Sequence, residues 1–167
     1  MNFFKNKHNY TELYNKIISL TREKFFYTEI NLNDSVITRL YLTYLHLGFI
    51  LKVLQKKNFD KKKTQEIYDI FFKNIELDFR QMGHGDVAVN KKMKELVRLF
   101  NEILLYCETW DKTELNHKIK YLTGLFKEND KKNINIDKLL VYIDNFVVNI
   151  ELMSLNLLLK GIIKIKK

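Results

Sequence analysis

Apolar residues recur every three or four positions along most of this chain, which is the spacing of one face of an α-helix. Six segments carry the pattern, at about 9–24, 34–56, 61–82, 90–109, 112–128 and 136–159. The second segment is apolar nearly all round, which is typical of the buried central helix of a bundle. Asn33 or Asp34 can cap its start, and the fifth segment opens with Asp111-x-x-Glu114, which is close to a capping box. The polar linkers at 57–60 and 129–135 are short, as expected between helices that pack together in one bundle.

The composition supports the same fold class. The chain has 167 residues, no proline and five glycines. Helix interiors exclude proline, whereas folds rich in strands and turns use it freely. We therefore predict an all-α fold: a single domain, 1–167, that forms a compact bundle of about six helices without β-sheet.

The formal net charge of +9 is compatible with a nucleic-acid or anionic-membrane partner. Nearly all of it comes from lysine, and Asn, Ile and Phe are also abundant, a mixture that an AT-rich genome gives to many soluble proteins. We therefore expect solvated lysine faces and no DNA partner. The first residues contain no apolar signal-peptide core, and the stretch Phe146–Ile163 is interrupted by polar residues, so we expect a soluble, cytoplasmic protein.

Reactive and metal-binding side chains form no catalytic pattern in the sequence. The four histidines lack metal-ligand spacing, and the single cysteine, Cys107, lies on an apolar helical face. Glycine patterns that bind phosphates or dinucleotides are absent. We expect no catalytic residue, no metal site, no cofactor and no enzymatic activity. His46 lies inside the apolar segment 34–56 and is expected to be a hydrogen-bonded core residue.

The chemically most mixed stretch is Arg80–Lys94, which joins the third and fourth segments and which we call the elbow. Gly83 suits the left-handed position that ends a helix, and His84 is expected to be exposed. Asp86 can pair with Arg80 or accept backbone N–H groups. The β-branched residues of Val87–Val89 favour an extended link, after which Asn90 is expected to cap the fourth helix.

Two blocks of residues resemble the ubiquinol–cytochrome c chaperone family, which includes mitochondrial assembly factors for cytochrome b and short alphaproteobacterial relatives. The first block is Phe26-Tyr27, Asp34, Arg39 and Leu45-His46. The second is Arg80-Gln81-Met82-Gly83-His84-Gly85-Asp86 with Val89-Asn90-Lys91-Lys92. The resemblance covers about 22–106, and we expect the helices at 112–159 to complete the bundle.

The chain departs from the family pattern at three positions. Thr38 stands where the family usually has Gly, Tyr41 where it usually has Glu, and Asn90 where it usually has Pro. Asn also starts helices well, so the last change is benign. The second change removes a carboxylate that could pair with Arg39.

The resemblance implies a non-enzymatic chaperone that binds nascent or unassembled cytochrome b for assembly of the bc1 complex. It also implies two further partners, the ribosome near its tunnel exit and a small helical co-chaperone, and a peripheral position at the inner face of the cytoplasmic membrane. The matching residues are the predicted partner-binding residues: Tyr27, Asp34, Arg39, His46, Arg80, Met82, Gly83, His84, Gly85, Asp86, Val89, Lys91 and Lys92.

Capture of a membrane protein requires an exposed apolar or aromatic groove. We expect such a groove beside the helix at 34–56, with the elbow at one end. Two alternatives stay open. A nucleic-acid-binding helix–turn–helix would present Lys91, Lys92, Lys94 and Arg98 to phosphates, but the expected link from Met82 to Asn90 is longer than the turn of that motif. A structural subunit that binds one mature partner is the other.

Overall fold

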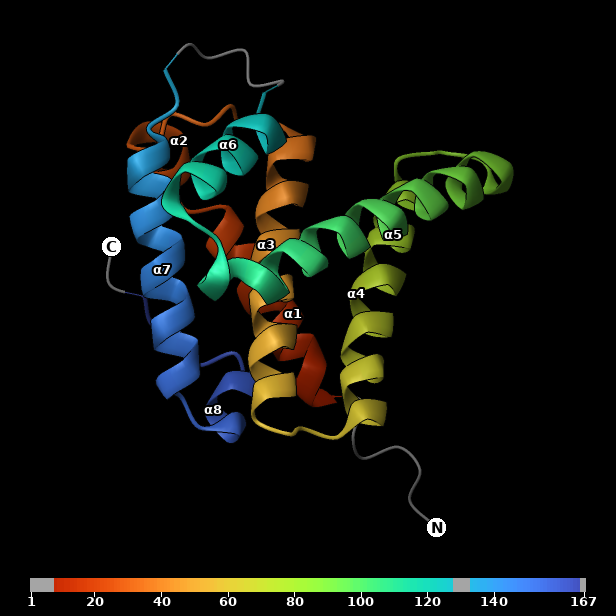
Figure 1. The fold of residues 1–167 in the computed structure, drawn as a ribbon. Coiled ribbons are helices and arrows are strands. Elements are labelled where there is room, and N and C mark those ends of the chain that lie inside the picture. The colour runs from red at the N-terminus through yellow and green to blue at the C-terminus, as the bar shows by residue number, and fades with distance from the viewer. Residues whose placement is uncertain (1–7, 128–132, 166–167) are drawn as a thin grey trace.

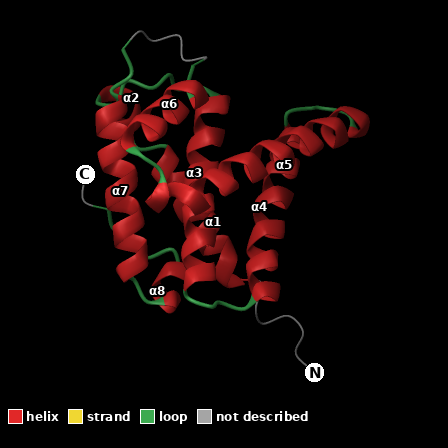
Figure 2. Cartoon of the chain, viewed as in Figure 1, coloured by secondary structure: helices red, strands yellow, loops and turns green. Residues whose placement is uncertain are grey.

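The computed structural model describes residues 8–127 and 133–165 of the chain. Within these ranges every regular element is helical and no strand occurs, as Figure 2 shows. The all-α prediction is confirmed. The elements are α1 (His8–Thr21), α2 (Lys24–Thr28), α3 (Val36–Lys56), α4 (Lys61–Gln81), α5 (Asp86–Thr109), the 3-10 turn η1 (Trp110–Lys112), α6 (Leu115–Leu125), α7 (Ile136–Leu152) and α8 (Leu155–Leu159).

Helix α3 is the centre of the bundle, with α1, α4, α5 and α7 packed around it (Figure 1). Every residue of α3 from Leu42 to Leu54 is buried. By length and composition α3 could also cross a membrane, but 72% of its most apolar stretch is buried inside the bundle. Helix α3 is apolar on all sides because other helices pack against it on all sides.

Helix α5 crosses α3 closely at Gly48. A Cβ atom built on Gly48 would lie 2.8 Å from the Sγ atom of Cys107, which is buried as predicted. Because glycine has no side chain, α5 can lie directly against the α3 backbone here. This contact holds the second half of α5 on the core, while its first half extends outward beyond α4 (Figure 1).

The six predicted segments correspond to the six long helices, but their ends differ in places. The first segment ends at Thr21, and the aromatic pair that follows it forms the short helix α2. The last segment is broken after Leu152, because the side chain of Ser154 accepts a hydrogen bond from the backbone N–H of Leu157 and starts α8. A serine at that position favours a new helix start over continuation.

The predicted start of α5 was wrong. The helix begins at Asp86 with Gly85 as N-cap, so Val87–Val89 is helical rather than extended and Asn90 lies within the second turn. The carboxylate of Asp86 lies in the first turn, where its negative charge interacts favourably with the positive end of the helix dipole and stabilises the helix. This local stabilisation outweighs the weak preference of valine for extended structure.

Two other predicted caps were also wrong, because the residues concerned are engaged elsewhere. Ser35, not Asn33 or Asp34, caps α3 by accepting a hydrogen bond from the N–H of Thr38 at 3.2 Å. Asp111 does not start α6; its carboxylate pairs at 2.6 Å with the ammonium group of Lys52, a residue of α3 that is 8% exposed. This ion pair ties the end of α5 to the central helix.

Candidate functional site

The first block of family-like residues surrounds the start of α3. Arg39 forms a two-pronged ion pair with Asp34, with Nε–Oδ1 and Nη2–Oδ2 distances of 2.7 and 2.9 Å. The hydrogen bonds to Asp34 raise the pKa of Arg39. The hydroxyl of Tyr27 donates to the carbonyl oxygen of Thr21. The ion pair holds the start of α3, and the hydrogen bond of Tyr27 joins α2 to the end of α1.

His46 is buried between α3 and α7, as predicted for a core residue. Its Nδ1 lies 2.6 Å from the carbonyl oxygen of Leu42, and its Nε2 lies 2.7 Å from the hydroxyl of Tyr142. A carbonyl can only accept, so Nδ1 carries the proton and Nε2 accepts from Tyr142. Burial lowers the pKa of His46 to about 4, so the ring is neutral at ordinary pH.

The elbow ends α4 in a Schellman motif. Gly83 adopts a φ of 86°, and its N–H donates to the carbonyl oxygen of Arg80 at 3.0 Å. The N–H of His84 reaches the carbonyl oxygen of Phe79 at 3.4 Å, and the two side-chain rings lie 5.9 Å apart between centroids. The left-handed position predicted for Gly83 is confirmed. Gly85, by contrast, has an ordinary φ of −70°.

Arg80 braces the elbow from the inside of the turn. Its guanidinium donates to Glu76, one turn earlier on α4, with Nη2–Oε1 at 2.8 Å, and also to Asp86 at the start of α5. The predicted pairing of Arg80 with Asp86 is confirmed. Both carboxylates raise the pKa of Arg80, so the brace stays charged over all ordinary pH values.

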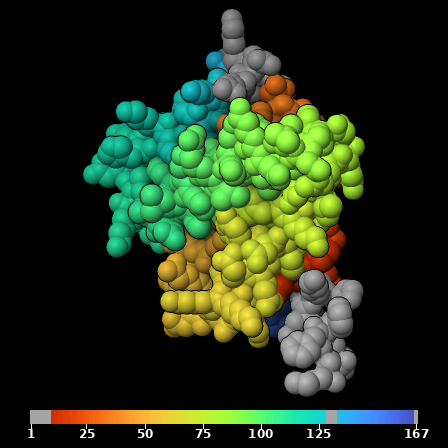
Figure 3. Space-filling view, turned by 90° about the vertical axis from the view of Figure 1, so that its right-hand side faces the viewer, coloured from red at the N-terminus to blue at the C-terminus, as the bar shows by residue number. Residues whose placement is uncertain are grey.

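The second block therefore holds its own shape while facing solvent. All residues from Arg80 to Ala88 are exposed, His84 included, and Val89 is buried. Figure 3 views the molecule from the side on which the elbow lies outermost. The structure does not bring the two blocks together: the first lies at the α2–α3 end of the bundle and the elbow at the outer end of α4 and α5 (Figure 1).

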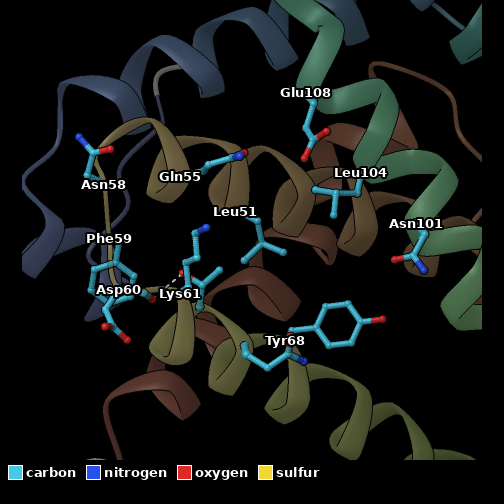
Figure 4. Close-up of a pocket in the computed structure, with 12 residues that line it drawn as sticks. Leu51, Gln55, Asn58, Phe59, Asp60, Lys61, Tyr68, Asn101, Leu104 and Glu108 are labelled. Atoms are coloured by element: carbon cyan, nitrogen blue, oxygen red, sulfur yellow. Dashed lines mark hydrogen bonds between the residues drawn. The ribbon is translucent and has the colours of Figure 1, made fainter.

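A groove of about 1020 Å³ lies between the end of α3, the start of α4 and the second half of α5 (Figure 4). Leu51, Phe59, Tyr68 and Leu104 supply its apolar surface. Around them lie mostly polar side chains: Gln55, Asn58, Asp60, Lys61, Thr64, Gln65, Asn101 and Glu108. This mixture of apolar and amide groups can contact both the side chains and the backbone of a bound segment.

A groove beside α3 was predicted, but its surroundings differ from the prediction. No residue of the elbow lines it, and its rim is more polar than an apolar client groove requires. The groove uses the first two turns of α4, whereas the elbow follows the last turn of that helix, so the two lie at opposite ends of α4. Sequence reasoning missed the lining residues, since they come from three segments whose exposed polar side chains carry no distinctive motif.

An aromatic cluster supports the groove from within. The ring of Tyr68 lies 4.5 Å from that of Phe72 and 5.6 Å from that of Phe100, measured between centroids. The ring of Tyr44 on α3 lies 5.2 Å from that of Phe100, and its buried hydroxyl has no hydrogen-bond partner among the described residues. Burial raises the pKa of Tyr44. The cluster fixes the spacing of α3, α4 and α5 and therefore the width of the groove.

One sequence argument against a helix–turn–helix does not survive. Because α5 begins at Asp86, the connection from α4 is the four residues 82–85, the length of the turn in that motif. Two of the cations that would face phosphates, however, already lie near carboxylates: Lys92 is 3.5 Å from Glu95, and Arg98 is 3.7 Å from Glu102. Among the described residues, no group of three or more His, Cys, Asp or Glu side chains could hold a metal ion.

Comparison with known proteins identifies the family. The family model of the ubiquinol-cytochrome C chaperone matches residues 28–118, a range that contains the elbow and every residue lining the groove. No curated protein matches the chain. The fold is similar to the crystal structure of the Cbp3 homolog from Brucella abortus, with a TM-score of 0.77 and 25% identity over 97% of this chain and 91% of that one. This chain belongs to the ubiquinol-cytochrome c chaperone family.

Proposed function

We propose that this chain is a non-enzymatic assembly chaperone that binds newly synthesised cytochrome b during assembly of the bc1 complex. One observation carries the proposal: the groove of about 1020 Å³ is built entirely from the segment that matches the family model. A family defined by that segment and named for a chaperone role is expected to hold its client with the surface that the segment builds.

The groove suits a reversible contact with a membrane protein. Its apolar surface can cover part of an apolar segment, while the surrounding amides satisfy polar backbone groups that would otherwise be left unpaired on binding. A chaperone must also release its client, and a polar rim limits the free energy that burial alone can supply. We therefore expect the groove to hold a helix end or loop of cytochrome b rather than a complete membrane span.

The test is capture of cytochrome b by the affinity-tagged full-length chain in detergent extracts of its host. Asn101→Trp adds a large side chain at the exposed wall of the groove, whereas Glu102→Trp adds the same side chain at the next, exposed position outside the lining. We expect the first variant to lose about tenfold or more of the captured cytochrome b and the second to retain it. Thermal unfolding of both variants checks that the fold is intact.

Absence of cytochrome b with the unmodified chain would overturn the proposal, and equal capture by the two tryptophan variants would exclude the groove as the surface that holds the client. Deletion of the gene with unchanged spectroscopic cytochrome b in the host would count against the assembly role itself. The ribosome and a small helical co-chaperone remain predicted partners, and the same extracts test them by the recovery of ribosomal proteins or of one small protein. Contact of the client with the elbow residues also remains a prediction, tested by Met82→Asp in the same assay.

A further inference from the structure

The elbow exposes apolar side chains at the outermost point of the molecule. Met82 is 55% exposed and Val87 is 85% exposed, and Leu77, on the last turns of α4, is 42% exposed. Exposed apolar residues are common when scattered singly. Here Met82 and Val87 lie on either side of one tight turn, and that turn projects away from the bundle (Figure 1).

The shape of the turn is fixed rather than loose. The Schellman motif closes α4, and Arg80 connects Glu76 of α4 to Asp86 of α5. A rigid turn cannot fold its apolar side chains back onto the bundle. Met82 and Val87 are therefore held in water unless another surface covers them.

Lysines lie directly behind this apolar tip. Lys91, Lys92 and Lys94 are all exposed, and they follow Val87 by four to seven residues along α5. At the rise of an α-helix that places their Cα atoms about 6–10 Å behind that of Val87. Two carboxylates lie near these lysines: Asp86, which Arg80 binds, and Glu95, which lies 3.5 Å from Lys92 in an exposed pair that solvent largely screens. The tip thus combines apolar side chains at its end with a set of cations behind them.

We propose that the elbow docks onto the surface of an anionic bilayer. Met82 and Val87 enter the boundary between headgroups and acyl chains, and Lys91, Lys92 and Lys94 contact the headgroup phosphates. Side chains that enter a membrane interface reach about 5–10 Å deep, which matches the offset between the apolar tip and the lysines. Lysines near such a surface are attracted by its negative potential.

The observations favour a bilayer over a nucleic acid. An RNA strand would pair with the lysines but leave Met82 and Val87 in water, and binding of single strands generally uses exposed aromatic rings for stacking. The elbow contains no Phe, Tyr or Trp, and its one ring, His84, already lies against Phe79 with 5.9 Å between the centroids. This inference does not depend on the client that the groove binds.

The experiment is co-sedimentation of the full-length chain with vesicles of phosphatidylcholine, with and without phosphatidylglycerol. We expect binding only to the anionic vesicles. The triple variant Lys91→Gln, Lys92→Gln, Lys94→Gln should bind about 100-fold more weakly, since each cation near the surface is worth about fivefold in affinity. Met82→Asp with Val87→Asp should also abolish binding, because a carboxylate at the tip is repelled and cannot enter the interface.

The chain offers two matched controls. Lys62, Lys63 and Lys73 are three other exposed lysines, all on α4, and their change to Gln should lower binding far less. Val148→Asp alters a residue of α7 that is 56% exposed and should leave binding unchanged. Equal losses in the two lysine triples would show attraction by net charge alone and overturn the proposal. So would absence of binding to anionic vesicles, or binding of poly(U) RNA that only the elbow lysine variant loses while vesicle binding persists.

Discussion

Helix α3 and the elbow contain residues of the two family-like blocks, and these residues make different kinds of contact in the two regions. In α3 the matched residues bind other residues of the chain: Arg39 binds Asp34, and His46 hydrogen-bonds to Leu42 and Tyr142. In the elbow the matched residues also bind one another, but they do so at the surface. The two blocks therefore differ in exposure: in the first, His46 is buried and the Arg39–Asp34 pair is partly exposed, whereas every elbow residue from Arg80 to Ala88 is exposed.

This difference separates residues that affect the stability of the whole chain from residues that affect only local structure and binding. Buried residues of α3 such as His46 act on function through the stability of the whole bundle, because removing them leaves polar groups or cavities in the core. Residues of the elbow can change without unfolding the chain, because few other residues depend on them. Variants of α3 should therefore alter global unfolding, and variants of the elbow should alter only local structure and binding.

The largest expected effect is the response of α3 to acid through His46. Burial lowers the pKa of His46 from 6.5 to about 4 in the folded chain, so the unfolded chain takes up the proton first. The associated stability is fully present above pH 6.5 and is lost as the pH falls towards 4, by about 3 kcal/mol in the free energy of unfolding. Urea unfolding at a series of pH values measures it.

His46→Gln is the control for this prediction, because it removes the titrating ring and keeps a polar side chain. Its unfolding free energy should fall less steeply between pH 7 and pH 4 than that of the unmodified chain. Parallel curves for the two proteins would contradict a neutral, buried ring. His84→Gln, at the exposed elbow, should leave the pH dependence unchanged.

The next effect concerns the crossing of α3 and α5. Gly48→Ala places a methyl group 2.8 Å from the Sγ of Cys107, which should cost about 1–2 kcal/mol of unfolding free energy after the gain from alanine's helix propensity. Gly124→Ala, in α6, meets no atom within 4 Å and should stabilise the chain by up to about 1 kcal/mol. Calorimetry or urea unfolding separates the two signs.

A second variant shows whether the contact itself is responsible. In a Cys107→Ala background the Sγ atom is absent, so Gly48→Ala should cost less there than in the unmodified chain. A cost that stays the same in both backgrounds would mean that the methyl group disturbs something other than the thiol.

The smallest global effect is expected at the brace of the elbow. Arg80→Ala removes the links to Glu76 and Asp86 but leaves the core untouched, so the urea midpoint should hardly move. Amide hydrogen exchange in the stretch 83–89 should accelerate by up to about tenfold, because local opening no longer breaks the ion pairs. Lys73→Ala, an exposed cation earlier on α4, should leave that exchange as it was. A large shift of the midpoint would remove the distinction between the two regions.

The sequence predicted the long helices well because each buries a face whose spacing is visible locally. The burial of His46 and Cys107 and the pairing of Arg80 with Asp86 followed from their position in that pattern. Features that depend on competition between neighbours were missed: Asp34 was expected at a cap but binds Arg39, and Ser35 took the cap. The start of α5 was predicted wrongly, because the prediction considered the preference of the valines for extended structure without the helix-favouring Asp86 before them.

The groove could not be predicted from the sequence in the form it takes. Its walls are contributed by the end of one helix, the start of the next and the distal half of a third, and their relative placement follows from the crossing at Gly48. Periodicity indicates which face of a helix is apolar but not where two helices cross along their length. The polar lining of the groove is indistinguishable, in sequence, from ordinary solvated helix surface.

The burial of Cys107 also makes the folded chain convenient to label. Its thiol is enclosed between α3 and α5, and burial raises its pKa, so almost none of it is the thiolate that maleimides and iodoacetamides attack. A cysteine introduced at the exposed position 82 would be the one reactive thiol of the native protein. A fluorophore or spin probe can therefore be attached to the elbow without first removing the natural cysteine.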